Sequence, residues 1–302
     1  METFNCPLCN SFDCEFVKAI ETEPLIQRWI AAFGIDVRNE FHGVRSLELR
    51  KCNRCGLQFF WPGFLAGSAR LYEELEKFDW YYLPKKWEHD VALQDIGGAA
   101  NGIEIGSGFG DFVARVLQEK HVSFEGCEQN ASAVEITRRK GLVVHLESIE
   151  NLAKVRPGVY DSVCSFQVLE HVRSPDSFLK ASCTILRPGG KLMLGLPNAS
   201  SFLRHQFNLL DLPPHHMTRW TEDVLFRLQE FFPLKLVRVA LEPLANYHVH
   251  DYVEAYWRAL STSWLRIPSI PAIESRIARA IQVSGLRRFL RGQTIYACYT
   301  RI

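Results

Sequence analysis

The stretch Ile103–Gly110, IEIGSGFG, places a short apolar run directly before a glycine-rich turn. Residues 111–119, which follow the turn, carry apolar side chains at helical spacing. A strand, a glycine turn and a helix in this order form the first unit of a doubly wound α/β fold. Glycine lets backbone amides approach a ligand closely and permits positive φ. The stretch predicts a loop for a nucleoside-bearing cofactor, although a simple tight turn has the same pattern.

Strands and helices alternate after this loop. Further strands are predicted at residues 122–126, 142–146, 160–166 and 191–197, with a last antiparallel pair at 234–240 and 294–299. The first of these strands leads to Glu128, where a carboxylate can accept hydrogen bonds from both ribose hydroxyls of an adenosine cofactor. The sequence therefore predicts an α/β fold, a Rossmann-like doubly wound sheet.

Two Cys-x2-Cys pairs lie near the amino terminus. They are Cys6, Cys9, Cys52 and Cys55. This spacing is typical of the two knuckles of a zinc ribbon, in which four thiolates close a tetrahedral structural site. Four unrelated thiols or a redox pair are the alternatives, and the redox role suits two pairs poorly. We expect a structural Zn²⁺ ion in a small N-terminal zinc-ribbon module.

The chain divides unevenly along its length. Residues 1–66 are expected to form the ribbon with a helical insertion, and residues 67–100 an aromatic helical connector. Residues 101–302 would form the larger domain, with helical insertions at 198–220 and 243–290.

Composition excludes several classes of protein. Of the 302 residues, 35 are Lys or Arg and 34 are Asp or Glu. The overall charge therefore does not favour binding to nucleic acid. The apolar share of 47% and the charged share of 23% argue against disorder, collagen and coiled coil. No long apolar run and no signal-like start is present, so we expect a cytoplasmic location.

Three segments in order resemble one enzyme family. They are IEIGSGFG from Ile103, VYDSVCSFQVLEHV from Val159 and LRPGGKLMLGLPN from Leu186. Together they resemble the class I methyltransferases that use S-adenosylmethionine. With the ribbon, the chain is similar to bacterial methyltransferases of this class, several of which act on sugars or cell-surface glycans.

The resemblance implies cofactor contacts by position. The implied residues are Glu104, Gly106, Ser107, Gly108, Gly110, Glu128, Glu147, Ser148, Gln167 and Val168. Glu128 would hold the ribose, and Glu147 with Ser148 the adenine. Upstream, Tyr81, Tyr82 and Trp87 would either close over the sulfonium through their aromatic faces or pack a linker helix on the sheet.

Histidines offer the candidate catalytic groups. His171 lies just after the fourth predicted strand, at the ligand-binding edge of such a sheet. His215 and His216 follow two prolines in the connection where this class builds its acceptor pocket. Each would act as general base or acceptor ligand, or else pack or cap a helix. Adjacent histidines rarely face one ion, which argues against a second metal site there.

The expected activity is methyl transfer from S-adenosylmethionine to an oxygen, or next a carbon, of a sugar, glycan or related small metabolite. Methylation of nucleic acid or protein recognised through the ribbon is the first alternative, and the balanced charge of residues 1–60 argues against nucleic acid. An inactive cofactor-binding scaffold is the second. The basic, amphipathic segment 273–292 is a candidate for peripheral membrane contact, although such a face more often packs on its own domain or on a second copy. The sequence leaves the oligomeric state open.

Overall fold

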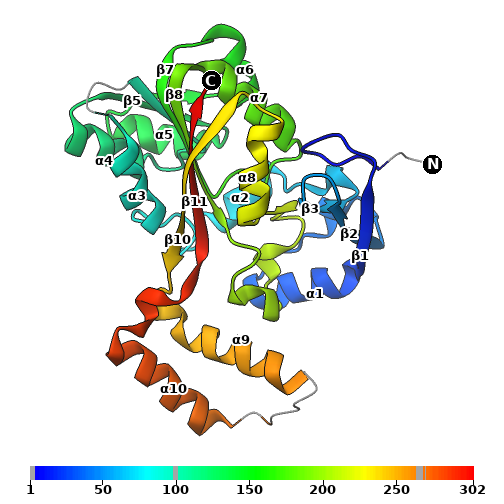
Figure 1. Cartoon of the computed structure of the whole chain (residues 1–302). Coiled ribbons are helices and arrows are strands. Elements are labelled where there is room, and N and C mark those ends of the chain that lie inside the picture. Colours follow the sequence, from blue (N-terminus) through cyan, green and yellow to red (C-terminus); the bar gives the residue numbers. More distant parts are fainter. Residues whose placement is uncertain (1–3, 98–100, 263–267, 269) are drawn as a thin grey trace.

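The computed structural model describes residues 4–97, 101–262, 268 and 270–302. Its larger sheet has seven strands in the order β10-β11-β8-β7-β4-β5-β6 (Figure 1). Their bounds are β4 (Asn101–Ile105), β5 (Ser123–Glu128), β6 (Val144–Leu146), β7 (Tyr160–Phe166), β8 (Leu186–Pro197), β10 (Leu234–Pro243) and β11 (Arg291–Arg301). Strands β6, β5, β4, β7 and β8 run parallel, and β11 and β10 continue the sheet antiparallel. The Rossmann-like doubly wound fold is confirmed.

Helices cover both faces of this sheet. On one face α3 (Trp87–Asp95) and α4 (Asp111–Lys120) bury apolar side chains against β5, β7, β8 and β11. On the other face lie α6 (Ile149–Val155), α7 (Pro175–Ile185) and α8 (Glu222–Arg227). Helix α5 (Ala131–Arg139) connects β5 to β6. Burial on both faces explains why the parallel strands read as near-continuous apolar runs.

The N-terminal module forms a second, smaller sheet. Strands β1 (Cys14–Glu21), β2 (Ser46–Cys52) and β3 (Gln58–Trp61) pair antiparallel, and β2 and β3 form a hairpin around the second cysteine pair. Helix α1 (Thr22–Phe33) is the predicted insertion, and it buries Leu25 and Trp29 against Leu47 and Phe60 of the sheet. The fourth strand is β9 (Thr218–Arg219), which comes from the larger domain.

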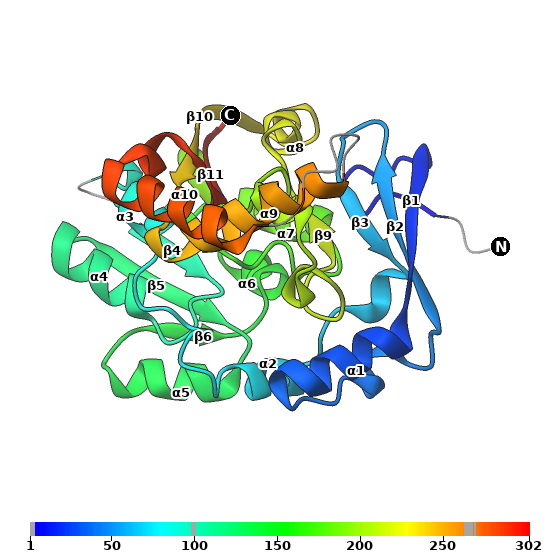
Figure 2. The same ribbon diagram turned by 90° about the horizontal axis from the view of Figure 1, so that it is seen from below.

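The two predicted insertions differ in structure. Residues 198–220 contain two short 3-10 turns and β9 but no α-helix, so this insertion is less helical than predicted. Near its end, Pro213 and Pro214 lack the amide donors of an α-helix. In the second insertion, α9 (Val249–Thr262) and α10 (Pro271–Ser284) lie side by side (Figure 2), at the end of the molecule that is lowest in Figure 1. Residues 263–267 and 269 of this predicted insertion lie outside the described residues.

The aromatic connector is helical as expected, with α2 (Ala69–Leu75) preceding α3. Among the described residues, no helix is long and apolar enough to cross a membrane. Helix α10 leaves Ile273, Ile277 and Val283 partly or largely exposed beside its arginines. Peripheral membrane contact through 273–292 stays a prediction.

Candidate functional site

A cavity of about 870 Å³ opens at the carboxyl ends of the parallel strands. Its lining begins at Gly106 after β4 and Glu128 at the end of β5. It continues past Gln167 after β7 to His216 in the connection that follows β8. In open α/β sheets this edge is where ligands bind. The sheet topology therefore brings most of the predicted cofactor residues and all the predicted catalytic histidines to one space.

The glycine loop adopts conformations that favour glycine. Gly106, Gly108 and Gly110 have φ angles of 76°, 49° and 74°. A Cβ on Gly106 would lie 2.3 Å from a methyl group of Val168, so the loop sits directly on the chain after β7. Gly110 is the N-cap residue of α4 and does not line the cavity.

Polar groups around this loop fit the proposed cofactor. Oε2 of Glu104 and Oγ of Ser107 are buried without a hydrogen-bond partner among the described residues. Burial raises the pKa of Glu104 well above its ordinary value. Glu128 accepts hydrogen bonds from the amides of Gly108, Gln129 and Asn130, which fix its carboxylate beside the loop. Two carboxylates and a free hydroxyl around a glycine cradle suit a ligand with an amino group and ribose hydroxyls.

The other implied cofactor residues divide into two groups. Glu147, Gln167 and Val168 line the cavity. Ser148 does not: its side chain accepts a hydrogen bond from the amide of Asn151 and caps α6. A serine at the start of a helix is often such a cap, and the local sequence does not separate this role from ligand binding.

The three aromatic residues of the connector all line the cavity. Tyr82 lies against the glycine loop, since a Cβ on Gly108 would approach its ring to 3.1 Å. The hydroxyl of Tyr81 lies 3.1 Å from Nε2 of His215. Trp87 begins α3, which packs on the sheet. The connector therefore contributes both cavity wall and packing.

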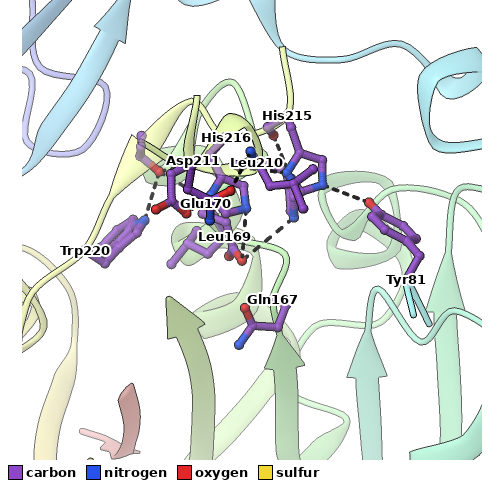
Figure 3. A network of polar contacts seen from close by, with 12 residues as sticks. Tyr81, Gln167, Leu169, Glu170, Leu210, Asp211, His215, His216 and Trp220 are labelled. Atoms are coloured by element: carbon purple, nitrogen blue, oxygen red, sulfur yellow. Dashed lines mark hydrogen bonds and ion pairs between the residues drawn. The ribbon is translucent and has the colours of Figure 1, made fainter. Parts of the chain in front are cut away.

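A cluster of three histidines and a glutamate lines the other end of the cavity. Figure 3 shows His215, His216 and Glu170 of this cluster. Nε2 of His171 lies 3.8 Å from Oε1 of Glu170, and Nε2 of His216 lies 3.9 Å from the same oxygen. Glu170 is 1% exposed, and neither carboxylate oxygen has a hydrogen-bond partner among the described residues. Nδ1 of His216 lies 3.5 Å from Asp211. His216, from the Pro213–His216 segment, and His171, from the chain after β7, thus both lie close to the buried carboxylate of Glu170.

The Nδ1 atoms of His171 and His215 are hydrogen-bonded to backbone carbonyls. Nδ1 of His171 donates to the carbonyl of His215 at 2.7 Å, and Nδ1 of His215 donates to the carbonyl of Leu210 at 2.8 Å. Both imidazoles therefore carry a proton on Nδ1 and a lone pair on Nε2. Burial holds the pKa of His171 and of His215 well below its ordinary value, and raises that of Glu170 to about 7. These two histidines are neutral at physiological pH.

Two acidic residues of the cavity carry no signal in the sequence. Glu88 on α3 and Glu242 on β10 are 3% and 8% exposed and line the same space. Oε1 of Glu88 accepts a hydrogen bond from the Gln167 amide, and Oε2 of Glu242 is buried without a partner. Only the packing of α3 and β10 on the sheet shows that these carboxylates face inward.

The four predicted metal cysteines meet in the structure. Sγ of Cys6 lies 3.5 Å from Sγ of Cys55, and Sγ of Cys9 lies 3.5 Å from Sγ of Cys52. All four sulfurs lie within 4.8 Å of one another. Four thiolates at Zn–S distances of about 2.3 Å would stand about 3.8 Å apart, so the cluster fits a closed tetrahedral zinc site.

The ribbon holds the histidine connection directly. Strand β9 pairs with β3, and the amide of Phe60 donates to the carbonyl of Met217 at 2.9 Å. The amide of Gly67 donates to the carbonyl of Pro214 at 2.8 Å. The amide of Met217 in turn donates to the carbonyl of Glu170 at 2.8 Å. The small sheet therefore supports the segment of the cavity wall that carries His215 and His216.

Comparison with known proteins gives related sequences and folds. The ubiquinone biosynthesis O-methyltransferase of Sodalis glossinidius (strain morsitans) is 27% identical over 117 residues, 36% of this chain and 47% of that protein. The protein of the same name from Xanthomonas euvesicatoria pv. vesicatoria (strain 85-10) is 42% identical over 53 residues, 18% of this chain and 22% of that protein. The chain thus spans about half or less of the length of these curated relatives.

One of the similar solved structures reaches a TM-score of 0.50 and shares the fold. A chain from the complex between the Haloferax volcanii Trm112 methyltransferase activator and a methyltransferase has a TM-score of 0.50 and 15% identity, covering 71% of this chain and 89% of that chain. A methyltransferase of Archaeoglobus fulgidus described as S-adenosylmethionine-dependent has a TM-score of 0.49 and 16% identity, covering 78% and 100%. A family model described as a methyltransferase domain matches residues 80–238, just over half of the chain. The chain belongs to this methyltransferase-domain family.

Proposed function

We propose that the protein is an S-adenosylmethionine-dependent methyltransferase that methylates a hydroxyl oxygen of a small metabolite. One observation carries this proposal: a single cavity joins the glycine loop and Glu128 to the cluster of Glu170 and its histidines. Groups suited to the cofactor and groups suited to accepting a proton line the same space. Membership of the methyltransferase family supports the reaction class.

The chain's own residues would align the acceptor and remove its proton. When bound, the cofactor supplies an electrophilic methyl group. The cavity wall would exclude water and hold the hydroxyl in line with that group. A hydroxyl needs a proton acceptor, and His216 and His171 each direct Nε2 toward Glu170 without a hydrogen-bonded partner on that side. We assign one of these two nitrogens as the base, with Glu170 beside the cation that forms.

His215 has a different part in this proposal. Its Nδ1 is bonded to the carbonyl of Leu210 and its Nε2 faces the hydroxyl of Tyr81. Both nitrogens are therefore engaged within the chain. We assign His215 as a positioning residue that orients Tyr81 and stacks on His216, with ring centroids 4.6 Å apart.

For the acceptor we propose a sugar, a glycan unit or a related hydroxylated metabolite. Glu88 and Glu242 line the cavity, and carboxylates accept hydrogen bonds from hydroxyl groups. The curated relatives carry O-methyltransferase names, which supports oxygen as the acceptor atom. The ribbon is joined to the larger domain through β9, which supports a structural role for it over recognition of nucleic acid or protein.

The test is release of S-adenosylhomocysteine. Wild-type protein would be incubated with S-adenosylmethionine and a panel of nucleotide sugars, free sugars and phenolic metabolites, and methylated product identified by mass spectrometry. We expect His216→Ala to lose most turnover and His205→Ala, a histidine that does not line the cavity, to keep it. Cofactor binding without product from any acceptor would favour the scaffold. Full turnover in both His171→Ala and His216→Ala would refute the base assignment.

A further inference from the structure

Two imidazole nitrogens and a carboxylate face one another in the cavity wall. Nε2 of His171 and Nε2 of His216 lie 3.8 and 3.9 Å from Oε1 of Glu170, too far for hydrogen bonds. Glu170 is buried, and both its oxygens lack a hydrogen-bond partner among the described residues. A buried carboxylate without partners is costly unless another group compensates it.

The protons on these rings point away from Glu170. Nδ1 of His171 lies 2.7 Å from the carbonyl of His215, which can only accept. Nδ1 of His216 lies 3.5 Å from the carboxylate of Asp211, which also accepts when ionised. Nε2 of His171 therefore presents a lone pair toward Glu170, and Nε2 of His216 does the same in the tautomer that carries its proton on Nδ1 beside Asp211. Two imidazole nitrogens thus lie within 4 Å of one carboxylate oxygen, and neither is hydrogen-bonded to it.

This arrangement is that of a metal site with its outer shell in place. Histidine ligands of metals commonly donate their second N–H to a backbone carbonyl or a carboxylate, as His171 does here, and Nδ1 of His216 lies 3.5 Å from the carboxylate of Asp211. Two histidines and one carboxylate form a facial set that leaves further positions open. Metal–donor bonds of about 2.1 Å place neighbouring donors about 3.4 Å apart in a tetrahedral site and about 3.0 Å apart in an octahedral one. Small side-chain rotations would close the observed 3.8 and 3.9 Å separations.

We propose that Glu170, His171 and His216 bind a divalent first-row transition-metal ion, such as Mn²⁺, Fe²⁺ or Zn²⁺. Imidazole ligands favour these ions over Mg²⁺ and Ca²⁺, which prefer oxygen. The sequence argument was that adjacent histidines rarely face one ion, yet ligand atoms of His171, His215 and His216 all lie within 4.8 Å of one another. His215 turns to Tyr81, and the second imidazole comes from His171, on the chain after β7.

The ion's open positions would face the cavity, because all three ligands line it. A hydroxyl oxygen bound there becomes more acidic, and its proton leaves to water as the oxygen binds the ion. This consequence rests on the proposed methylation of a hydroxyl group. In that case the ion takes over the proton-removing role from the imidazoles, and it also fixes the acceptor oxygen.

The experiment separates this site from the cysteine cluster. The protein would be dialysed until it retains one zinc per chain, and Mn²⁺ would then be titrated while free Mn²⁺ is followed by electron paramagnetic resonance. Mn²⁺ competes poorly with zinc for thiolates, so it reports the histidine site. We expect about one bound Mn²⁺ per chain, an affinity at least about 100-fold lower in His216→Ala and Glu170→Gln, and one about 10-fold lower in Asp211→Asn.

Controls keep the outcome decisive. His205→Ala should bind Mn²⁺ as the wild type does, and each ligand variant should retain its melting-temperature rise with S-adenosylmethionine, which shows a folded cavity. The proposal is overturned if wild type binds neither Mn²⁺ at 1 mM nor a second zinc, or if the ligand variants bind as tightly as wild type. Methyl transfer that persists under chelator would then leave the proposed function standing alone. Metal binding without any methylated product would leave the metal site standing alone.

Discussion

The backbone amide of Gly108 donates a hydrogen bond of 2.9 Å to Oε2 of Glu128. This contact ties the turn after β4 to the end of β5, the neighbouring parallel strand. The other oxygen of Glu128 accepts from the amides of Gln129 and Asn130. One carboxylate therefore fixes the glycine loop and stands beside the space proposed for the ribose, so the loop and the ribose site depend on the same side chain.

Glu128→Ala should abolish binding of S-adenosylmethionine. The substitution removes the proposed ribose acceptor and frees the Gly108 amide. We expect wild type to gain several degrees in melting temperature with saturating S-adenosylmethionine, since a ligand at 100 times its Kd adds about 2.7 kcal/mol, and the variant to gain none. Glu135→Ala, on the outer surface of α5, is the matched control and should respond as wild type does. Equal shifts in all three proteins would contradict the ribose assignment.

Gly106→Ala should destabilise the fold more than Gly141→Ala. Both glycines have positive φ, 76° and 79°, so each substitution carries a conformational cost of about 1–2 kcal/mol. A Cβ at Gly106 would also lie 2.3 Å from Val168, whereas nothing lies within 4 Å at Gly141. Overpacking adds about 1–3 kcal/mol at Gly106 alone.

Urea unfolding of the two variants measures this difference. Adding Val168→Ala to Gly106→Ala should recover part of the steric cost, because it removes the methyl group that the new Cβ meets. Equal free energies of unfolding for the two single variants would show that the loop shifts to accommodate the methyl group.

Local patterns were enough to predict the larger sheet. Its parallel strands are buried apolar runs, and β4, the glycine turn and α4 follow one another directly along the chain. The cysteine spacing likewise predicted the cluster, because two knuckles need only local turns to present four thiolates. These features depend on residues that are close in sequence or on the order of strands.

The histidine site depends on contacts between distant segments. His171 follows β7, while His216 lies in a connection whose position is set by the two-residue strand β9 on the ribbon sheet. A strand of two residues has no sequence signal, and neither has the inward orientation of Glu88 on α3. The sequence identifies His171 and His216 individually as candidates, but it does not predict that both lie beside Glu170.

Loss of zinc should loosen the histidine connection. The cysteines anchor β2 and β3, and β3 holds β9 and the amide-to-carbonyl contact from Phe60 to Met217. In Cys9→Ser we expect the zinc content to fall and amide hydrogen exchange across residues 214–219 to become at least about tenfold faster. Amide exchange in strand β11, which belongs to the seven-stranded sheet, should stay slow.

Cys14→Ser is the control for this prediction. Cys14 lies near the cluster, but its thiol faces the carbonyl of Ser11 at 3.5 Å and it lies outside the group of four. This variant should keep its zinc and its slow exchange. Unchanged exchange in a zinc-free Cys9→Ser protein would show that the connection holds its place without the ribbon.

Acidification should destabilise the protein partly through His89. Burial, with Lys86 and Arg115 nearby, lowers the pKa of His89 from 6.5 to about 3. Between these pH values His89 binds a proton in the unfolded chain but not in the folded chain. Its contribution to the free energy of unfolding is therefore full above pH 6.5 and is lost as the pH drops toward 3. One such group contributes up to about 1.4 kcal/mol per pH unit. His89→Phe, which suits the aromatic contacts with Phe112 and Phe166, should therefore show a shallower decline in unfolding free energy between pH 6 and 4. His121→Asn, at an exposed position, should decline as wild type does, and parallel curves for all three proteins would contradict the prediction.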